Sequence, residues 1–246
     1  KKVKPLINFR QGNLPPTVFA KFYLFTPFFK KWNKIIYLDA DIMVLAPITQ
    51  LTKLSGFNAV KDYLSPKLYH QFENTKQNPI LSAKLKKDFL LNTEAFNSGV
   101  MIFSTDIIEK NAIKKLSNLA KNYLSILRFG EQSPLNLYFY KKWKTLPIVY
   151  NIIPFYIEKS SNIEKIKTII LHFAGEKPWK ETKKYHSAYK IWERSLKNAE
   201  SIKKLPSAKP KKSWTEEEIR KESNKLERKL YSNLLKKDYE HFKGGV

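Results

Sequence analysis

The 246-residue sequence predicts an α/β fold in which a mixed sheet is flanked by helices. Short apolar segments of strand length alternate along the chain with longer segments whose apolar residues recur at helical spacing, and this alternation is typical of α/β proteins. With 42% hydrophobic residues, the chain can also bury a substantial core, either as one large domain or as two small ones.

The first hundred residues are expected to supply one aromatic helix and three strands. Residues Phe19 to Lys31 have aromatic side chains at helical spacing until a proline interrupts them. Lys34 to Asp39 has the composition of a buried strand, and Phe57 to Lys61 is a second candidate. The polar segment Ser65 to Phe89 predicts a helix and a loop, and Phe96 to Phe103 predicts a strand entered through a tight Asn-Ser-Gly turn.

The middle of the chain predicts two helices followed by two strands. Asp106 to Leu127 has apolar residues along one helical face, and Gln132 to Tyr140 is a second helix that tolerates Pro134 in its first turn. Leu146 to Tyr150 and Thr168 to Phe173 are the strand candidates.

The C-terminal part has a different composition, which suggests a domain at 1–196 followed by a basic linker and amphipathic helix at 197–246. Lys203 to Lys212 is rich in lysine and proline, as expected of a linker. Ser213 to Glu216 fits a capping box. The helix that follows has an apolar stripe of Ile219, Leu226, Leu230 and Leu234. Such a basic helix can pack on its own domain, bind a partner or lie on an anionic membrane.

Composition narrows the classes of function. The net charge is +24, and it favours anionic partners such as phospholipid, nucleic acid or a phosphorylated substrate, although an AT-rich genome would also enrich lysine and asparagine. The absence of cysteine excludes disulfides and Cys-ligated zinc, and it fits a reducing compartment. No apolar run approaches the roughly 20 residues of a membrane span. Because the chain opens at Lys1 without a methionine, we expect an N-terminal segment to be missing.

An acidic pair at the end of the first predicted strand is the leading candidate for a metal site. Asp39 and Asp41 are separated by the small Ala40, so at a strand period of two their carboxylates would point to the same side. Two converging carboxylates repel each other unless a hard divalent cation lies between them. The alternative is an ordinary solvated turn.

Four motifs, in order, resemble those of glycosyltransferase family 8. The block from Phe19 to Leu45, which contains Tyr-Leu-Asp-Ala-Asp-Ile, is similar to the family's Asp-x-Asp region, and Phe96-Asn-Ser-Gly-Val-Met101 is similar to its second motif. Glu131-Gln-Ser-Pro-Leu-Asn136 resembles the family's Asp-Gln-Asp-x-Leu-Asn stretch. His172-Phe-Ala-Gly-Glu-Lys-Pro-Trp179 resembles its C-terminal His-x-x-Gly…Lys-Pro-Trp motif, although one residue separates Gly175 from Lys177 where relatives often have two.

The resemblance implies a GT-A-type fold, a metal and a nucleotide-sugar donor. His172 would join Asp39 and Asp41 as a metal ligand, and a histidine added to two carboxylates favours Mn²⁺, with Mg²⁺ as the other possibility. The donor would contact Asp39, Ala40 and Asp41 through the metal site. The other implied donor contacts are Lys21, Asn97, Gly99, Gly175 and Lys177.

Glu131 and Gln132 are the implied catalytic pair. The family retains anomeric configuration, and because an amide is a poor nucleophile we favour a front-face reaction in which Gln132 stabilises the oxocarbenium-like centre. Glu131 replaces the more common aspartate, so contacts with the acceptor are expected to differ from those in relatives.

The resulting expectation is a retaining, metal-assisted hexosyltransferase. It would use UDP-galactose or UDP-glucose and a saccharide or glycolipid acceptor such as lipopolysaccharide core. We expect it in the cytoplasm, with possible peripheral attachment to the membrane through the C-terminal helix. The resemblance also implies that the segment reading the nucleotide base lies before this chain. The rival interpretations are an inactive or truncated sugar-nucleotide-binding protein and a basic nucleic-acid binder, and no recognised motif supports the latter.

Overall fold

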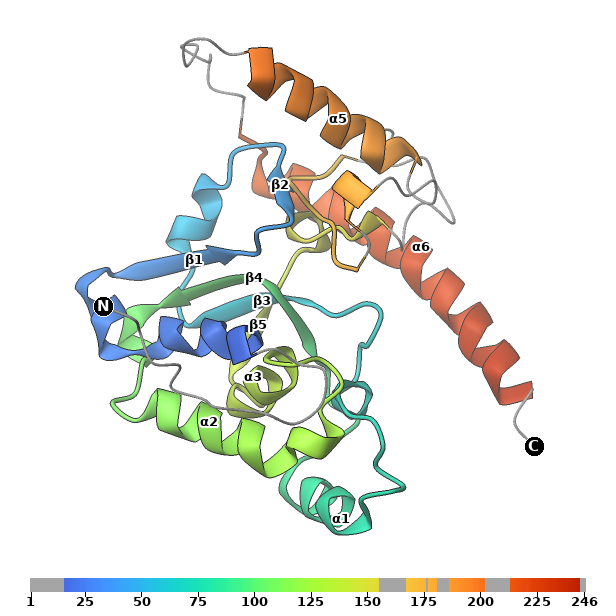
Figure 1. Cartoon of the computed structure of the whole chain (residues 1–246). Helices are drawn as coiled ribbons and strands as arrows, with labels where there is room; N and C mark the ends of the chain where they lie inside the picture. The colour runs from blue at the N-terminus through green and yellow to red at the C-terminus, as the bar shows by residue number, and fades with distance from the viewer. Residues whose placement is uncertain (1–15, 155–166, 176, 181–185, 202–212, 244–246) are drawn as a thin grey trace. The chain divides into compact units, whose positions relative to one another are not determined.

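The computed structural model describes residues 16–154, 167–175, 177–180, 186–201 and 213–243, with the side chains of the last helix described up to Leu230. The chain, drawn in Figure 1, divides into two compact units. Unit 1 comprises Lys1–Tyr37 and Leu54–Thr145, and unit 2 comprises Leu38–Lys53 and Leu146–Val246.

Unit 1 is built on a four-stranded sheet with the order β1-β4-β3-β5. Its strands are β1 (Lys34–Leu38), β3 (Phe57–Lys61), β4 (Phe96–Ser104) and β5 (Trp143–Leu146). The predictions of strands at 34–39, 57–61 and 96–103 are therefore confirmed. All five residues of β3 are buried, including the polar Asn58 and Lys61, because the strand lies between β4 and β5 in the sheet.

The Asn-Ser-Gly segment belongs to β4, so the predicted turn before that strand is wrong. β3 and β4 are antiparallel, with Ala59 opposite Met101 but Val60 opposite Asn97. Residues 98–100 are therefore extra on β4 and form a bulge, and pairing resumes at Asn97 and Phe96. Bulges redirect side chains and are common beside functional sites.

Helical segments of unit 1 gather on one face of this sheet, where Figure 1 shows η1, α2 and α3 together. The segments are η1 (Pro16–Phe25), η2 (Pro27–Lys31), η4 (Leu68–Gln71), α1 (Pro79–Asp88), η5 (Thr105–Ile107), α2 (Ala112–Tyr123), η6 (Leu124–Ile126) and α3 (Gln132–Tyr138). The predicted helix at 19–31 forms as two 3₁₀ segments on either side of Thr26. The helix predicted from Asp106 begins only at Ala112, because Ile108 is extended.

Aromatic rings fill the core of unit 1. Phe25 stacks on Phe103 with 4.9 Å between ring centroids, and Phe57 stacks on Phe139 at 3.8 Å. All four rings are almost fully buried. Burial of each ring stabilises the fold by about 1.5–3 kcal/mol, so this cluster fixes the helices against the sheet.

Unit 2 contains a two-stranded antiparallel sheet of β2 (Ile42–Val44) and β6 (Ile170–His172). The remaining elements are η3 (Thr49–Lys53), η7 (Ile148–Tyr150), η9 (Pro178–Lys180), α5 (His186–Ser201) and α6 (Glu216–Lys243). The strand predicted at 168–173 is confirmed as β6. The strand predicted at 146–150 is wrong, because the chain turns at Pro147 into the 3₁₀ segment η7. Helix α5 was not predicted.

The C-terminal helix α6 packs on unit 2. Its capping box joins Thr215 and Glu218: Glu218 N–H donates to Thr215 Oγ1 at 3.2 Å, and Thr215 N–H donates to Glu218 Oε2 at 2.7 Å. This box lies two residues later than the predicted Ser213–Glu216 box. Ile219, Leu226 and Leu230 of the predicted stripe are buried, and α6 contacts η7.

Two parts of the C-terminal prediction lie outside the described residues, namely the linker at 203–212 and the side chain of Leu234. Helix α5 continues through residue 196, where we placed the domain boundary, and the division into 1–196 and 197–246 stays a prediction. Among the described residues, no helix has the length and apolar character needed to cross a membrane.

Candidate functional site

The two predicted aspartates lie in the turn between β1 and β2, in unit 2. Asp39 follows β1, Asp41 precedes β2, and Ala40 is exposed between them. The carboxylates therefore converge because the chain turns there, and not because they alternate along one strand. The pairing of β2 with β6 places Ile42 opposite His172, and Phe173 N–H donates to Asp41 O at 2.9 Å. This pairing carries His172 to the acidic turn.

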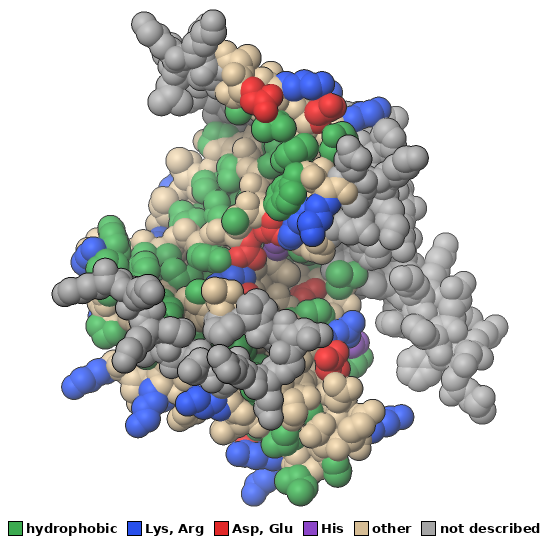
Figure 2. All heavy atoms as spheres, in the orientation of Figure 1, with side chains coloured by type: hydrophobic (Ala, Val, Ile, Leu, Met, Phe, Trp, Pro, Cys, Tyr) green, Lys and Arg blue, Asp and Glu red, His purple; other side chains and the backbone are tan. Residues whose placement is uncertain are grey.

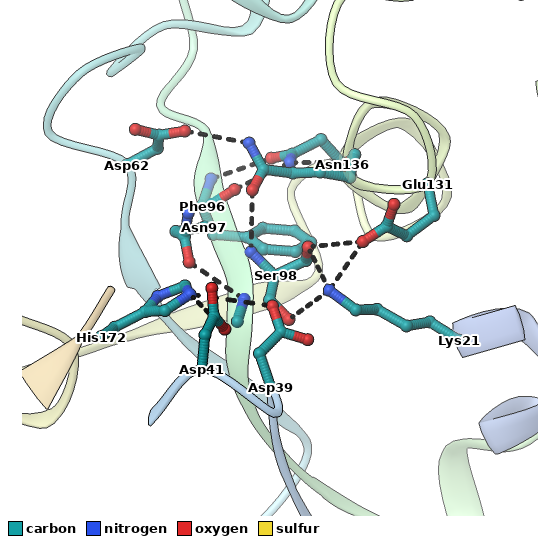
Figure 3. Close-up of polar contacts among 12 residues, drawn as sticks. Lys21, Asp39, Asp41, Asp62, Phe96, Asn97, Ser98, Glu131, Asn136 and His172 are labelled. Carbon is teal, nitrogen blue, oxygen red and sulfur yellow. Dashed lines mark hydrogen bonds and ion pairs between the residues drawn. The ribbon is translucent and has the colours of Figure 1, made fainter. Parts of the chain in front are cut away.

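The three side chains form a cluster able to hold a metal ion (Figure 3). His172 Nε2 lies 3.4 Å from Asp41 Oδ1 and 3.8 Å from Asp39 Oδ2, and one ligand atom from each residue lies within 4.8 Å of the others. A small divalent ion holds its ligands at about 2.1 Å in an octahedral arrangement, which separates neighbouring ligands by about 3–4 Å. The cluster therefore matches the size of such an ion.

Asn151 sets the tautomer of His172. Both side chains are buried, and His172 Nδ1 lies 2.8 Å from Asn151 Oδ1. Because a carbonyl oxygen only accepts, Nδ1 carries the proton of this hydrogen bond and Nε2 is directed at the two carboxylates. Orientation of a ligating histidine by a hydrogen bond from its second nitrogen is a regular feature of metal sites.

Lys177 supplies a positive charge beside the cluster. Its ammonium group forms an ion pair with Asp41 Oδ2 and donates to Phe173 O at 3.0 Å. Burial alone would raise the pKa of Asp41, but the hydrogen bonds and charges of its neighbours, among them the Lys177 ammonium group, outweigh burial and hold that pKa well below its usual range. Asp41 is thus ionised at neutral pH, as a metal ligand must be.

Gly175 lies between His172 and Lys177 in the chain and has φ of +90°. This backbone conformation is one that residues with a Cβ rarely adopt, so glycine is required here by the backbone. Gly175 is exposed, and among the described residues other than its chain neighbours none has a heavy atom within 4 Å of the position of an added Cβ.

In unit 1, the predicted donor contact Lys21 is held by Glu131. Lys21 Nζ lies 2.6 Å from Glu131 Oε1 and 3.2 Å from Ser98 Oγ, and both charged side chains are mostly buried, at 12% and 16% exposure. Lys21 extends from η1, Ser98 lies in the β4 bulge, and Glu131 is the residue before α3. The lysine therefore links three elements and fixes the carboxylate of Glu131.

The amide of Gln132 is fixed in one orientation. Its Nε2 donates to Asp62 Oδ2 at 2.9 Å and to Gln71 Oε1 at 3.1 Å, while its Oε1 accepts from Ser98 N–H at 3.0 Å. A flipped amide would set oxygen against two oxygen atoms and NH₂ against N–H. Burial raises the pKa of Asp62, and hydrogen bonds from Ser65, Gln132 and others oppose this shift.

The remaining predicted residues of unit 1 lie in or next to the β4 bulge. Gly99 N–H donates to Asn97 Oδ1 at 2.9 Å, so the asparagine side chain supports the bulge itself. Asn136 of α3 pairs with the backbone of Phe96: its Oδ1 accepts from Phe96 N–H and its Nδ2 donates to Phe96 O, both at 2.9 Å. The Gln-x-x-x-Asn spacing thus places both amides against β4, and Figure 3 shows Asn136 beside Phe96.

The predicted site residues therefore fall into two groups, one in each unit, and three supporting residues were missed. Asp62 directly follows β3, and a polar residue ending an apolar strand was a usable signal, as it was for Asp39. Gln71 and Asn151 carry no such signal, because their partners Gln132 and His172 lie 61 and 21 residues away in the chain.

Comparison with known proteins identifies the class. The fold matches LgtC, a galactosyltransferase: an active-site mutant of LgtC superposes with a TM-score of 0.60 at 18% sequence identity, covering 83% of this chain and 75% of LgtC. GlyE from Streptococcus pneumoniae matches with a TM-score of 0.53, over 78% of this chain and 44% of GlyE. The architecture is thus a GT-A-type α/β fold, a mixed sheet flanked by helices.

The family follows from the sequence match. The sequence profile of the family described as "Glycosyl transferase family 8" matches residues 9–183, so the chain belongs to glycosyltransferase family 8. Galactinol synthase 4 of Arabidopsis thaliana is 28% identical over 165 residues, covering 63% of this chain and 48% of the relative. Lipopolysaccharide 1,2-glucosyltransferase of Escherichia coli is 28% identical over 200 residues, covering 75% and 56%. The chain spans about half the length of the curated relatives it matches.

Proposed function

We propose that this chain transfers a hexose from UDP-galactose or UDP-glucose to a saccharide or glycolipid acceptor, with retention of anomeric configuration. The observation that carries the proposal is the Asp39, Asp41 and His172 cluster of unit 2, with Lys177 beside it, inside a region matched to family 8. The relative named lipopolysaccharide 1,2-glucosyltransferase supports a glycolipid as the acceptor class.

The residues of unit 2 would bind the leaving diphosphate. Two carboxylates and the Nε2 of an imidazole suit Mn²⁺, and Mg²⁺ is the other possibility. The ion would act as a Lewis acid that stabilises the charge developing on the diphosphate. Lys177 is the second positive charge at this place, and in the present structure Asp41 neutralises it. Gly175 leaves the backbone accessible to a phosphate group.

The residues of unit 1 would act on the sugar. In the reaction, the bond from the anomeric carbon to the diphosphate breaks, a bond to the acceptor oxygen forms on the same face, and the acceptor proton passes to a departing phosphate oxygen. Gln132 Oε1, held by Ser98 N–H, presents partial negative charge that stabilises an oxocarbenium-like centre. Glu131 and Lys21 are the groups available to bind sugar hydroxyls, and Asn97 and Gly99 shape the bulge beside them.

A donor screen tests the reaction. The chain is incubated with a panel of UDP-sugars with Mn²⁺, with Mg²⁺ or with chelator, and release of UDP is measured with and without saccharide acceptors. We expect metal-dependent release, lost in Asp39→Asn and retained in Asp106→Asn, an exposed acid of unit 1 that serves as the matched control. Binding of UDP with Mn²⁺ but no turnover of any donor would instead identify an inactive sugar-nucleotide-binding protein.

Replacement of Gln132 tests its separate role. Gln132→Ala should lower kcat by about 10²-fold or more, as loss of an electrostatic stabiliser does, while donor affinity stays within a few-fold. Gln77→Ala, at an exposed position of unit 1, is the control. Full turnover by Gln132→Ala would show that the amide has no part in the chemistry.

A further inference from the structure

An aromatic and basic ridge on unit 1, formed by Phe28, Lys30, Lys31 and Trp32, lies at η2 and the residue that follows it. Phe28 is 61% exposed and Trp32 is 44% exposed. Their rings are in contact, with centroids 5.7 Å apart in an edge arrangement. Two large aromatic side chains in contact with each other and with solvent lose the benefit of burial, and such patches mark interaction surfaces.

The ridge is held rigidly by the backbone beneath it. Phe29 is half-buried and packs on the core of unit 1. Trp32 N–H donates to Phe29 O at 3.2 Å, and Trp32 O accepts from the hydroxyl of Thr105. Thr105 N–H also donates to Asn33 O at 3.1 Å. The outward aromatic residues are therefore fixed in position, and a partner would not have to order them.

The ammonium group of Lys31 covers both exposed rings. Lys31 Nζ lies 3.8 Å from the centroid of the Phe28 ring and 4.3 Å from that of the Trp32 ring. Lys30 is exposed next to it. An ammonium group above an aromatic ring is attracted by the ring face, and it can turn toward an anionic group while its alkyl chain stays on the ring.

The charged residues next to the ridge in the sequence are all positive. Between residues 16 and 38 there are four lysines and no Asp or Glu. From the packed neighbour η5, Asp106 contributes one exposed carboxylate. Figure 2 shows hydrophobic and basic side chains side by side at the left edge of the molecule, where Figure 1 draws η2 and the start of β1.

We propose that this ridge is a membrane-contact element that binds the surface of an anionic phospholipid bilayer. Tryptophan and phenylalanine partition into the headgroup region of a bilayer, and each lysine near an anionic surface adds attraction. The amphipathic helix α6 is the other candidate for that role, but Ile219, Leu226 and Leu230 of its stripe are buried against unit 2. The inference does not depend on the proposed transfer reaction.

Vesicle binding by the whole chain tests the proposal. Co-sedimentation with phosphatidylcholine vesicles, with and without phosphatidylglycerol, should show binding only to the anionic vesicles. Phe28→Ser with Trp32→Ser, and separately Lys30→Glu with Lys31→Glu, should each weaken partitioning by about tenfold or more. Ile80→Ser with Leu90→Ser removes apolar side chains that are 84% and 63% exposed in the same unit, and it should leave binding unchanged.

A depth measurement distinguishes contact from a mere loss of stability. With brominated lipid, the tryptophan fluorescence of the wild type should be quenched on binding. Trp32→Phe should still bind while losing most of that quenching. Thermal melting checks that each variant is folded.

Three outcomes would overturn the proposal. These are a wild-type chain that ignores anionic vesicles, ridge variants that bind as well as wild type, and ridge variants that dissociate a dimer in light scattering, which would make the ridge a contact between copies.

Discussion

Removal of the Asn151 side chain should weaken metal binding although all three metal-ligating residues stay in place. Asn151 Oδ1 accepts a hydrogen bond from His172 Nδ1–H at 2.8 Å, and both residues are buried. In Asn151→Ala that N–H loses its partner, and the proton is free to move to Nε2, the atom that faces Asp39 and Asp41. A protonated Nε2 cannot bind a cation, so part of the population would be unable to use the third ligand.

The size of the effect follows from the geometry. Loss of a hydrogen bond that orients a ligating histidine lowers metal affinity by about 10–100-fold, which corresponds to about 1.4–2.7 kcal/mol. Asn151→Asp should keep the affinity within a few-fold of wild type, because a carboxylate also accepts from Nδ1–H. The alanine and aspartate variants therefore separate the hydrogen bond from the volume of the side chain.

Titration with Mn²⁺ measures the effect directly. Free Mn²⁺ is followed by electron paramagnetic resonance or heat by calorimetry, on wild type, Asn151→Ala, Asn151→Asp and the control Asn198→Ala on the exposed face of α5. An alanine variant that binds Mn²⁺ as tightly as wild type would refute the tautomer argument. Equal losses in the alanine and aspartate variants would point to general damage around His172.

Three further predictions concern charge and packing. Lys177→Ala removes a positive charge and an ion pair of Asp41. In steady-state assays the KM for the nucleotide sugar should therefore rise by about tenfold, while kcat at saturating donor changes little. Because the pKa of Asp41 is lowered in the folded protein, its ionised form stabilises the fold above the unfolded value of about 3.9, and this is lost as pH falls through the folded value. The stability advantage of wild type over Asp41→Asn, measured by urea unfolding without metal, should therefore shrink from pH 5 downward, and a constant difference would contradict this account. Asn136→Ala leaves Phe96 N–H and C=O unpaired in a buried region and should cost about 3 kcal/mol in the same assay, whereas a cost under about 0.5 kcal/mol would show that water replaces the amide.

Much of the fold was predictable because it depends on local composition. The strands at 34–39, 57–61 and 168–173 each contain apolar residues over a length typical of a strand, and such short segments can be recognised without tertiary information. The strand predicted at 146–150 failed because the same apolar run also suits a buried 3₁₀ turn, and Pro147 decided between them. The capping box shifted by two residues because two overlapping Ser/Thr-x-x-Glu patterns compete there, and only the hydrogen bonds to Glu218 select one.

For the site, the sequence by itself determined the ligand types and their order: Asp39 and Asp41 after a strand, His172 at the end of another, and Gln132 at the start of a helix. The tertiary structure decided the rest, because it depends on partners far apart in the chain. The pairing of β2 with β6 carries His172 to the acidic turn, and Asn151 fixes its tautomer. Burial of the α6 stripe likewise could not be read from its amphipathic pattern, since that pattern suits a protein core and a membrane surface equally.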